Sequence, residues 1–88
     1  MNAEQASKLI LHPYITEKTF ALIEKENKIV FIVHDQADKK STMEALKVLY
    51  DVEADTVNMA RTIYGKKAFV RMKTDGGARD LATKLGLV

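Results

Sequence analysis

The run from Lys28 to His34, K-I-V-F-I-V-H, constrains the fold of this chain more than any other stretch. A strand with one face in water alternates apolar and polar side chains, but the five central residues here are all apolar and all favour strands. We therefore expect a strand that is covered on both faces, with helices on both sides of its sheet. The same five residues are the longest wholly apolar run in the chain, and they are too few to span a membrane.

A hairpin is predicted between Thr56 and Thr74, where two runs rich in Val, Ile, Thr, Tyr and Phe meet at Y-G-K-K. With Gly65 and Lys66 as the turn residues, glycine takes the first position, as a type II′ turn requires. This turn would place Asn58 opposite Lys73 across the two strands. The sequence therefore predicts both a turn type and a register.

The two faces of this hairpin are expected to differ in chemistry. The predicted apolar face holds Val57, Met59, Ile63, Ala68, Val70 and Met72. The other face mixes amide, hydroxyl and aromatic groups with basic side chains. The cations of the hairpin are Arg61, Lys66, Lys67, Arg71 and Lys73, and residues 56–74 include no Asp or Glu. Arg61 departs from this division because it falls on the apolar face.

The length of 88 residues predicts one small domain, 1–88. Such a domain buries only about 60–65% of its unfolded surface, so a binding partner would add useful stability. The absence of cysteine excludes disulfides and thiolate zinc sites. Residues 1–55 carry seven Lys against ten Asp and Glu, whereas residues 56–88 carry seven Lys and Arg against two Asp. This asymmetry indicates either an acidic side and an anion-binding basic side, or ordinary solubilising charge.

Further elements are expected before and after these strands. Residues 2–8 can form a short helical turn, and Leu9–Leu11 can form an edge strand that ends at His12-Pro13. Thr16 is the predicted N-cap of a helix over 17–26 that ends at Asn27. The helix that follows the Lys28–His34 strand is predicted to begin at Asp38, or at Ser41 with Glu44 in a capping box. The final helix is predicted to begin at Asp75 and to end at Gly86.

These elements predict an α+β domain with a small, four-stranded, mainly antiparallel sheet in the chain order (β)-α-β-α-β-β-α and helices on both faces. The Leu9–Leu11 strand should pair with the Lys28–His34 strand, because a covered strand still needs neighbours for its backbone groups. The spatial order would continue with the strand after the hairpin turn and end with the strand before it. The two later helices should cover one face, and the helix over 17–26 should partly cover the other.

No catalytic constellation is visible, so we expect neither an enzyme nor a cofactor. The cluster His34, Asp35 and Asp38 has a spacing that matches no common metal site, and no metal is predicted. Gly76-Gly77 precedes a helix but lacks the Lys-Ser/Thr pair that follows in phosphate-binding loops.

The stronger signal is the pair of aromatic residues Tyr64 and Phe69 beside the cations of the hairpin. Bases stack on aromatic rings while Lys and Arg neutralise phosphates, so this pattern favours RNA. Phe69 itself is expected to lie under the helix over 17–26. The segment from Ala68 to Met72 resembles half of an RNA-recognition motif, although Lys67 replaces its first stacking aromatic residue and no final strand is predicted after the last helix.

A closer resemblance covers nearly the whole chain. The segments H-P-Y-I-T-E-K (residues 12–18), K-I-V-F (28–31), V-N (57–58) and K-K-A-F-V (66–70), together with Val52, occur at characteristic separations. Together they resemble the large-subunit ribosomal protein L23 family in its short archaeal form. The resemblance implies a small fold with an antiparallel sheet and a structural role at the rim of the peptide exit tunnel. The implied partners are large-subunit ribosomal RNA, neighbouring ribosomal proteins, signal recognition particle and nascent-chain factors, with no membrane.

The resemblance also implies roles for individual residues and a location. Its RNA-side positions correspond here to Thr16, Lys18, Asn58, Lys66 and Lys67, and its protein-docking position to Glu17. With the hairpin cations, the predicted RNA-binding residues are Thr16, Lys18, Asn58, Arg61, Lys66, Lys67, Arg71 and Lys73. The protein would be a monomer within the cytoplasmic ribosome. Two alternatives remain open at this stage: a free-standing RNA-recognition module, and a ligand-sensing or dimerising regulatory domain.

Overall fold

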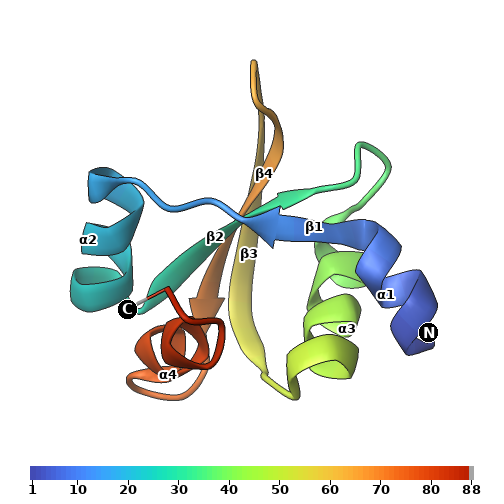
Figure 1. Ribbon diagram of the computed structural model, residues 1–88. Helices are drawn as coiled ribbons and strands as arrows, with labels where there is room; N and C mark the ends of the chain where they lie inside the picture. Colours follow the sequence, from blue (N-terminus) through green and yellow to red (C-terminus); the bar gives the residue numbers. More distant parts are fainter. Residues whose placement is uncertain (88) are drawn as a thin grey trace.

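The structure is a computed structural model that describes residues 1–87, so Val88, the last residue of the predicted domain, lies outside the described residues. Four helices and four strands make up the described chain (Figure 1). In order, they are α1 (Ala3–Leu9), β1 (Ile10–Pro13), α2 (Glu17–Glu26), β2 (Lys28–Val33), α3 (Lys39–Tyr50), β3 (Ala54–Thr62), β4 (Gly65–Met72) and α4 (Gly77–Lys84). The predicted α+β class and element order are confirmed. The predicted helical turn over 2–8 is the helix α1, which includes Leu9, so the edge strand predicted for Leu9–Leu11 begins instead at Ile10 and continues to Pro13.

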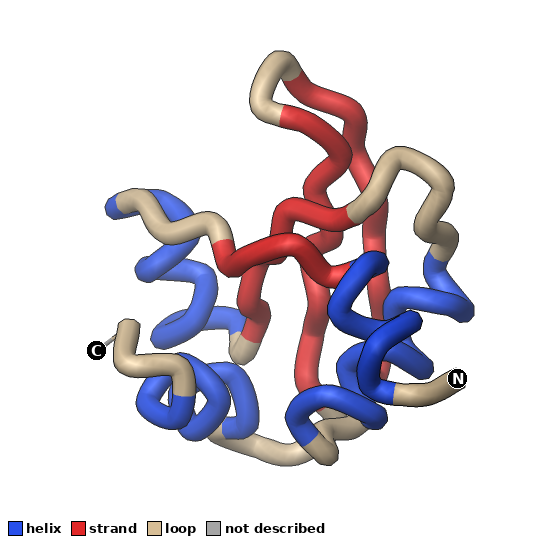
Figure 2. The backbone as a smooth tube through the Cα atoms, turned by 45° about the vertical axis from the view of Figure 1, so that its right-hand side comes forward, coloured by secondary structure: helices blue, strands red, loops and turns tan. Residues whose placement is uncertain are grey.

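The four strands form one antiparallel sheet in the order β1-β2-β4-β3 (Figure 2). This is the predicted spatial order. β1 pairs only with the second half of β2, from Phe31 to Val33, and the backbone N–H of Tyr14 donates to the carbonyl of Val30 at 2.8 Å. In an RNA-recognition motif, a final strand follows the last helix. Here all four strands precede α4, and residues 85–87 form no strand.

The two faces of the sheet have different surroundings. Side chains that face each other across antiparallel strands share a face, so the register assigns each residue to a side. The face that we call the first face is apolar and carries Ile29, Phe31, Val57, Ala68 and Val70, all buried under α1, α3 and α4. The second face carries Thr56, Asn58, Ala60, Lys67, Phe69 and Arg71 on β3 and β4, and these side chains are exposed or half-buried.

Strand β2 is buried on both faces, as its unbroken apolar run predicts. All residues from Ile29 to Val33 are at most 4% exposed. Helix α2 contacts β2 and reaches both sides: Ile23 joins the core of the first face, whereas Thr19 and Leu22 lie near Phe69 of the second. Phe69 is half-buried there, consistent with its expected position beside this helix.

Helix ends follow local sequence signals with one exception. Thr16 and Asp38 are N-caps whose side chains accept from the N–H three residues later, and Asn27 ends α2 in a left-handed conformation with φ 56°. Gly86, with φ 74°, ends α4. The backbone N–H groups of residues 86 and 87 donate hydrogen bonds to the carbonyls of residues 83 and 82, respectively. The predicted cap Asp75 is wrong, since α4 begins after Gly76 and has no side-chain cap from its own segment.

The cap of α4 comes from a distant residue, Asn27. Its Oδ1 accepts from the N–H of Ala78 at 2.9 Å, while its Nδ2 donates to the carbonyls of Met72 and Thr74 at 3.2 and 2.8 Å. One side chain therefore joins the end of α2, the end of β4 and the start of α4. This explains why a local reading of residues 75–77 misplaced the cap.

Replacing Asn27 by glycine should lower the free energy of unfolding by about 2–4 kcal/mol, because three hydrogen bonds worth about 0.5–1.5 kcal/mol each are lost. Glycine keeps the left-handed backbone, so strain does not contribute. The matched control is Asp51→Gly, at a second left-handed helix end (φ 55°) with an exposed side chain. Urea denaturation of both variants checks this, and equal stabilities would contradict the role of Asn27.

The hairpin register differs from the prediction. The turn residues are Ile63 and Tyr64, both with negative φ, and Gly65 follows them with φ 114°. A type I turn followed by a glycine at positive φ fits these values, and a type II′ turn does not. Asn58 therefore lies opposite Phe69, not Lys73. Because the turn moves by two residues, an even number, each strand residue keeps its predicted face.

One consequence of this shift concerns Ile63, which was expected on the apolar face. It lies at the tip of the hairpin and is 92% exposed. The tip extends beyond the helices, as the upper end of β4 shows in Figure 1. The hydroxyl of Thr62 stabilises the turn, since it accepts from the N–H of Tyr64 at 3.2 Å and donates to the carbonyl of Gly65 at 2.9 Å.

Candidate nucleic-acid interface

The second face of the sheet collects cationic, aromatic and amide side chains in register. Across β3 and β4, Ala60 lies opposite Lys67, Asn58 opposite Phe69, and Thr56 opposite Arg71. Side chains that are paired in this way lie within about 5.5 Å at their Cβ atoms. The face therefore presents a compact, mixed surface on the two strands of the hairpin.

Lys67 is held between two tyrosines on this face. Its Nζ lies 3.8 Å from the ring centroid of Tyr14 and 5.4 Å from that of Tyr64, and the two ring centroids are 6.0 Å apart. A cation over an aromatic face is attracted by the ring quadrupole. The arrangement fixes the Lys67 ammonium near the hairpin tip, where it can still meet an anion. Sequence reasoning did not single out Tyr14, which only the family resemblance brings in as part of its H-P-Y segment.

A hollow of about 410 Å³ lies between the start of α2 and β4. Its α2 side is formed by Thr16, Lys18, Thr19 and Leu22. Its other side is formed by Tyr14, Lys67 and Phe69. The capping box of α2, in which Thr16 Oγ1 accepts from the Thr19 N–H at 3.2 Å and Thr19 Oγ1 accepts from the Thr16 N–H at 2.7 Å, holds this side in place. The fold thus brings three of the predicted RNA-binding residues, Thr16, Lys18 and Lys67, together around one hollow.

Arg61 and Lys66, also in the predicted set, lie on the first face near the hairpin tip. Arg61 forms an ion pair with Asp35, and the Nζ of Lys66 donates to the carbonyls of Asp35 and Ala37. Both cations therefore hold the loop between β2 and α3 against the hairpin. Lys66 and Lys67 are neighbours in sequence, but alternation along the strand directs them to opposite faces.

The remaining predicted residues lie near the edges of the molecule. Lys73 follows β4 and forms an ion pair with Glu53 at 3.8 Å. Glu17, in the first turn of α2, is exposed. Glu24 and Glu26 are also exposed, and they pair with Arg79 at 2.9 Å and with Lys28 at 3.4 Å, respectively. Two of the three carboxylates of α2 are therefore paired with cations.

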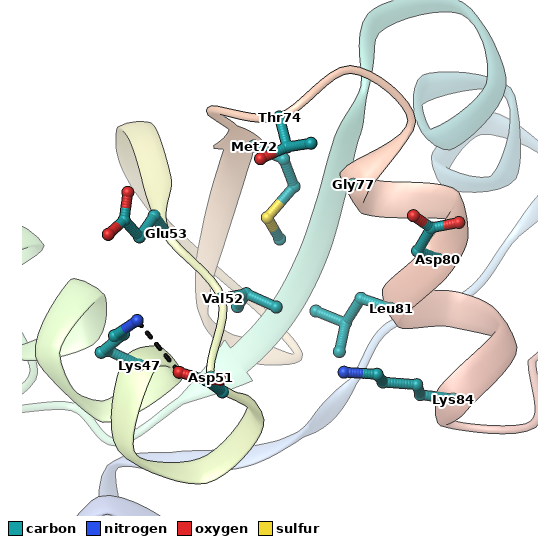
Figure 3. Close-up of a pocket in the computed structure, with 10 residues that line it drawn as sticks. All are labelled: Lys47, Asp51, Val52, Glu53, Met72, Thr74, Gly77, Asp80, Leu81 and Lys84. Atoms are coloured by element: carbon teal, nitrogen blue, oxygen red, sulfur yellow. Dashed lines mark ion pairs between the residues drawn. The ribbon is translucent and has the colours of Figure 1, made fainter.

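A larger hollow, of about 500 Å³, lies on the other side of the molecule between the end of α3 and α4 (Figure 3). Its apolar part is Val52, Met72 and Leu81, and its charged part is Lys47, Lys84, Asp51, Glu53 and Asp80. The Lys47–Asp51 ion pair, at 3.0 Å, raises the pKa of Lys47 and lowers that of Asp51, since each charge stabilises the other. Three carboxylates against two lysines make this hollow less suited to an anion than the hollow beside Lys67.

Among residues 1–87, no three His, Asp or Glu side chains lie close enough together to hold a metal ion. Within the same range, no helix is both long and apolar enough to cross a membrane.

The pKa of Asp38 is lowered because the Ser41 backbone N–H donates to its carboxylate, which is a helix-capping interaction.

Comparison with known proteins agrees with the segments that carry the resemblance. The family described as Ribosomal protein L23 matches residues 8–84. The large ribosomal subunit protein uL23 of Methanococcus aeolicus is 41% identical over 80 residues, which cover 90% of this chain and 93% of that protein. The matched range includes β1 to α4, and with them the second face and the hollow. This chain is therefore a member of the ribosomal protein L23 family.

Proposed function

We propose that the chain is a structural constituent of the large ribosomal subunit and binds large-subunit ribosomal RNA through its second face. Its family membership and its 41% identity to a large-subunit protein support this placement. As a ribosomal protein, it functions in the cytoplasm. Its role is structural rather than catalytic, with one copy per subunit and other ribosomal proteins as neighbours.

The observation that carries the proposal is the composition of the second face. Lys67 and Arg71 are directed to the same side as Phe69 and Asn58, and residues 56–74 carry no acid that would oppose a phosphate. Lys18 extends the positive charge across the hollow from α2. Phosphate contacts by Lys and Arg supply most of the affinity for RNA, whereas aromatic and amide groups contact bases.

Neighbouring lysines give a direct test of which face meets RNA. Lys67→Gln should weaken binding to large-subunit ribosomal RNA and reduce the log–log slope of affinity against salt by about 0.7–0.9, the contribution of one phosphate contact. Lys66→Gln removes the same charge one residue away on the other face, and should leave the slope nearly unchanged. A salt titration by filter binding measures both. A larger slope change in Lys66→Gln would place the RNA on the first face.

We further propose that the protein lies at the rim of the peptide exit tunnel and that Glu17 is a contact for signal recognition particle or other nascent-chain factors. The exposed carboxylate of Glu17, which lies in the first turn of α2 between the hollow-lining residues Thr16 and Lys18, supports a protein contact next to the RNA-binding residues. The turn of only two residues, Ile63-Tyr64, gives the hairpin a short reach, so the proposal includes no tunnel lining.

Glu17→Ala should reduce binding of signal recognition particle to ribosomes several-fold while leaving incorporation of the protein into the large subunit unchanged. The reason is that the Glu17 side chain is exposed in the first turn of α2 and is not among the residues that line the hollow. Glu4→Ala, at an equally exposed first-turn position of α1, is the control. Loss of incorporation in Glu17→Ala would instead assign Glu17 a structural role at the positive end of the helix dipole.

A further inference from the structure

We propose that the hollow between α2 and β4 binds a single unstacked base of the ribosomal RNA. This inference rests on the proposed RNA-binding function and adds the chemical group that the site would take. The base would stack on Phe69 inside the hollow, with its phosphate at the mouth beside Lys67. Lys67 and Arg71 would then position the RNA, and the hollow would contact one nucleotide of it.

The size and lining of the hollow fit a planar, partly apolar ligand. Its volume of about 410 Å³ falls within the range of about 300–1,000 Å³ that is typical of small-molecule sites. Its lining includes Leu22 and the buried Thr19, and Phe69 and Tyr14 supply aromatic rings. Bases stack on such rings irrespective of their sequence, because every base has a π-face.

The charges of the lining distinguish a nucleotide from a protein side chain. Lys18 and Lys67 border the hollow, and its lining includes no carboxylate among the described residues. The cation–π contact of 3.8 Å with Tyr14 holds the Lys67 ammonium where the phosphate of an inserted nucleotide would lie. By contrast, the hollow between α3 and α4 contains Asp51, Glu53 and Asp80, which would repel a phosphate.

Asn58 provides a polar group beside the stacking position. It is exposed and lies directly opposite Phe69 across β3 and β4. An amide both donates and accepts, so it can form a hydrogen bond to the edge of a base that stacks on the neighbouring ring. We therefore expect Asn58→Ala to weaken binding without changing the salt slope, because no charge is removed.

The test compares three variants of the full chain for binding to purified large-subunit ribosomal RNA. Phe69→Leu keeps apolar volume but removes the ring, and should weaken binding about 5- to 150-fold, the equivalent of the ~1–3 kcal/mol that one base–aromatic stack contributes. Phe69→Tyr keeps the ring and should bind like the original chain. Phe20→Leu, which removes a half-buried ring of α2 outside the lining of the hollow, should also bind normally. Circular dichroism and thermal melting confirm that all three fold.

Ultraviolet cross-linking of the same complexes gives a second readout. A base in contact with Phe69 or Tyr14 should yield a nucleotide adduct on one of these residues, and Phe69→Leu should lose the adduct at Phe69. Unchanged affinity of Phe69→Leu, together with a normal salt slope, would overturn the base site while leaving RNA binding intact. Failure of the original chain to bind the RNA at all would instead contradict the proposed function. Saturable binding of AMP alone that is lost in Phe69→Leu would identify a free-nucleotide site and overturn the assignment to RNA.

Discussion

Replacing Lys67 and Arg71 together by glutamate is expected to lower the affinity for large-subunit ribosomal RNA by more than about 100-fold. Each lysine or arginine bonded to a phosphate contributes about 1.5–3 kcal/mol, so losing two contacts costs about 3–6 kcal/mol before repulsion by the new carboxylates is counted. Both side chains lie on the second face, with Arg71 exposed and Lys67 half-buried, and neither belongs to the apolar core. The expected effect is therefore on binding rather than on folding.

The matched control for this variant is Lys39→Glu with Lys40→Glu, which makes the same change in charge. Both lysines are exposed in the first turn of α3, on the other side of the molecule. A carboxylate is favourable at the start of a helix, so the control should fold at least as well as the original chain. A similar loss of affinity in both double variants would mean that only net charge matters, and it would contradict a localised RNA interface.

The second large effect is expected from Phe31→Ala, which should lower the free energy of unfolding by about 3–5 kcal/mol. Phe31 is fully buried on β2 and stacks on Tyr50 of α3 with ring centroids 6.1 Å apart and an interplanar angle of 17°. Natural domains are stable by only about 5–15 kcal/mol, and a small domain lies toward the lower end. Chemical denaturation of the free protein should therefore show a substantially unfolded variant at room temperature.

Two comparisons make this prediction specific. Tyr64→Ala removes a ring that is 64% exposed at the hairpin tip, and should change stability by less than about 1 kcal/mol. Saturating ribosomal RNA should raise the melting temperature of Phe31→Ala, because a ligand that binds only the folded state stabilises it by mass action. An unfolding energy of Phe31→Ala within about 1 kcal/mol of the original would show that β2 is not the centre of the core.

Much of the architecture could be predicted because local signals and tertiary packing agree along most of the chain. The unbroken apolar run of β2 does predict burial on both faces. Thr16 and Asp38 do cap the starts of their helices, and Asn27 does end α2. The faces of the hairpin also follow from alternation alone. These features depend on periodicity and on side chains that bond to their own backbone, so a single sequence contains the information.

The parts that could not be predicted depend on contacts between distant segments. The start of α4 is capped by Asn27, some fifty residues earlier, so Asp75 was a misleading local signal. At Gly77, a side chain would place its Cβ 2.9 Å from the Cβ of Met72, which is a packing constraint invisible in the sequence. The hairpin turn was misplaced because glycine at positive φ can lie within a turn or directly after it.

The candidate interface shows the same division. Sequence pattern placed Lys67, Phe69 and Arg71 on one face, and the register confirms that they share it. It could not show that Tyr14, from a connection fifty residues earlier, lies over Lys67. Nor could it show that the loop between β2 and α3 folds back onto Arg61. Those contacts depend on how the edge strand and the loops pack against the hairpin.

In the proposed function, the second face attaches this protein to the large ribosomal subunit. Co-sedimentation with ribosomes tests it most directly, with tagged copies of the original chain, of Lys67→Glu with Arg71→Glu, and of Lys39→Glu with Lys40→Glu. We predict that the original chain and the Lys39 and Lys40 variant sediment with the large subunit, while the Lys67 and Arg71 variant stays in the soluble fraction as folded protein. Sedimentation of the Lys67 and Arg71 variant with the large subunit at the level of the original chain would contradict the account.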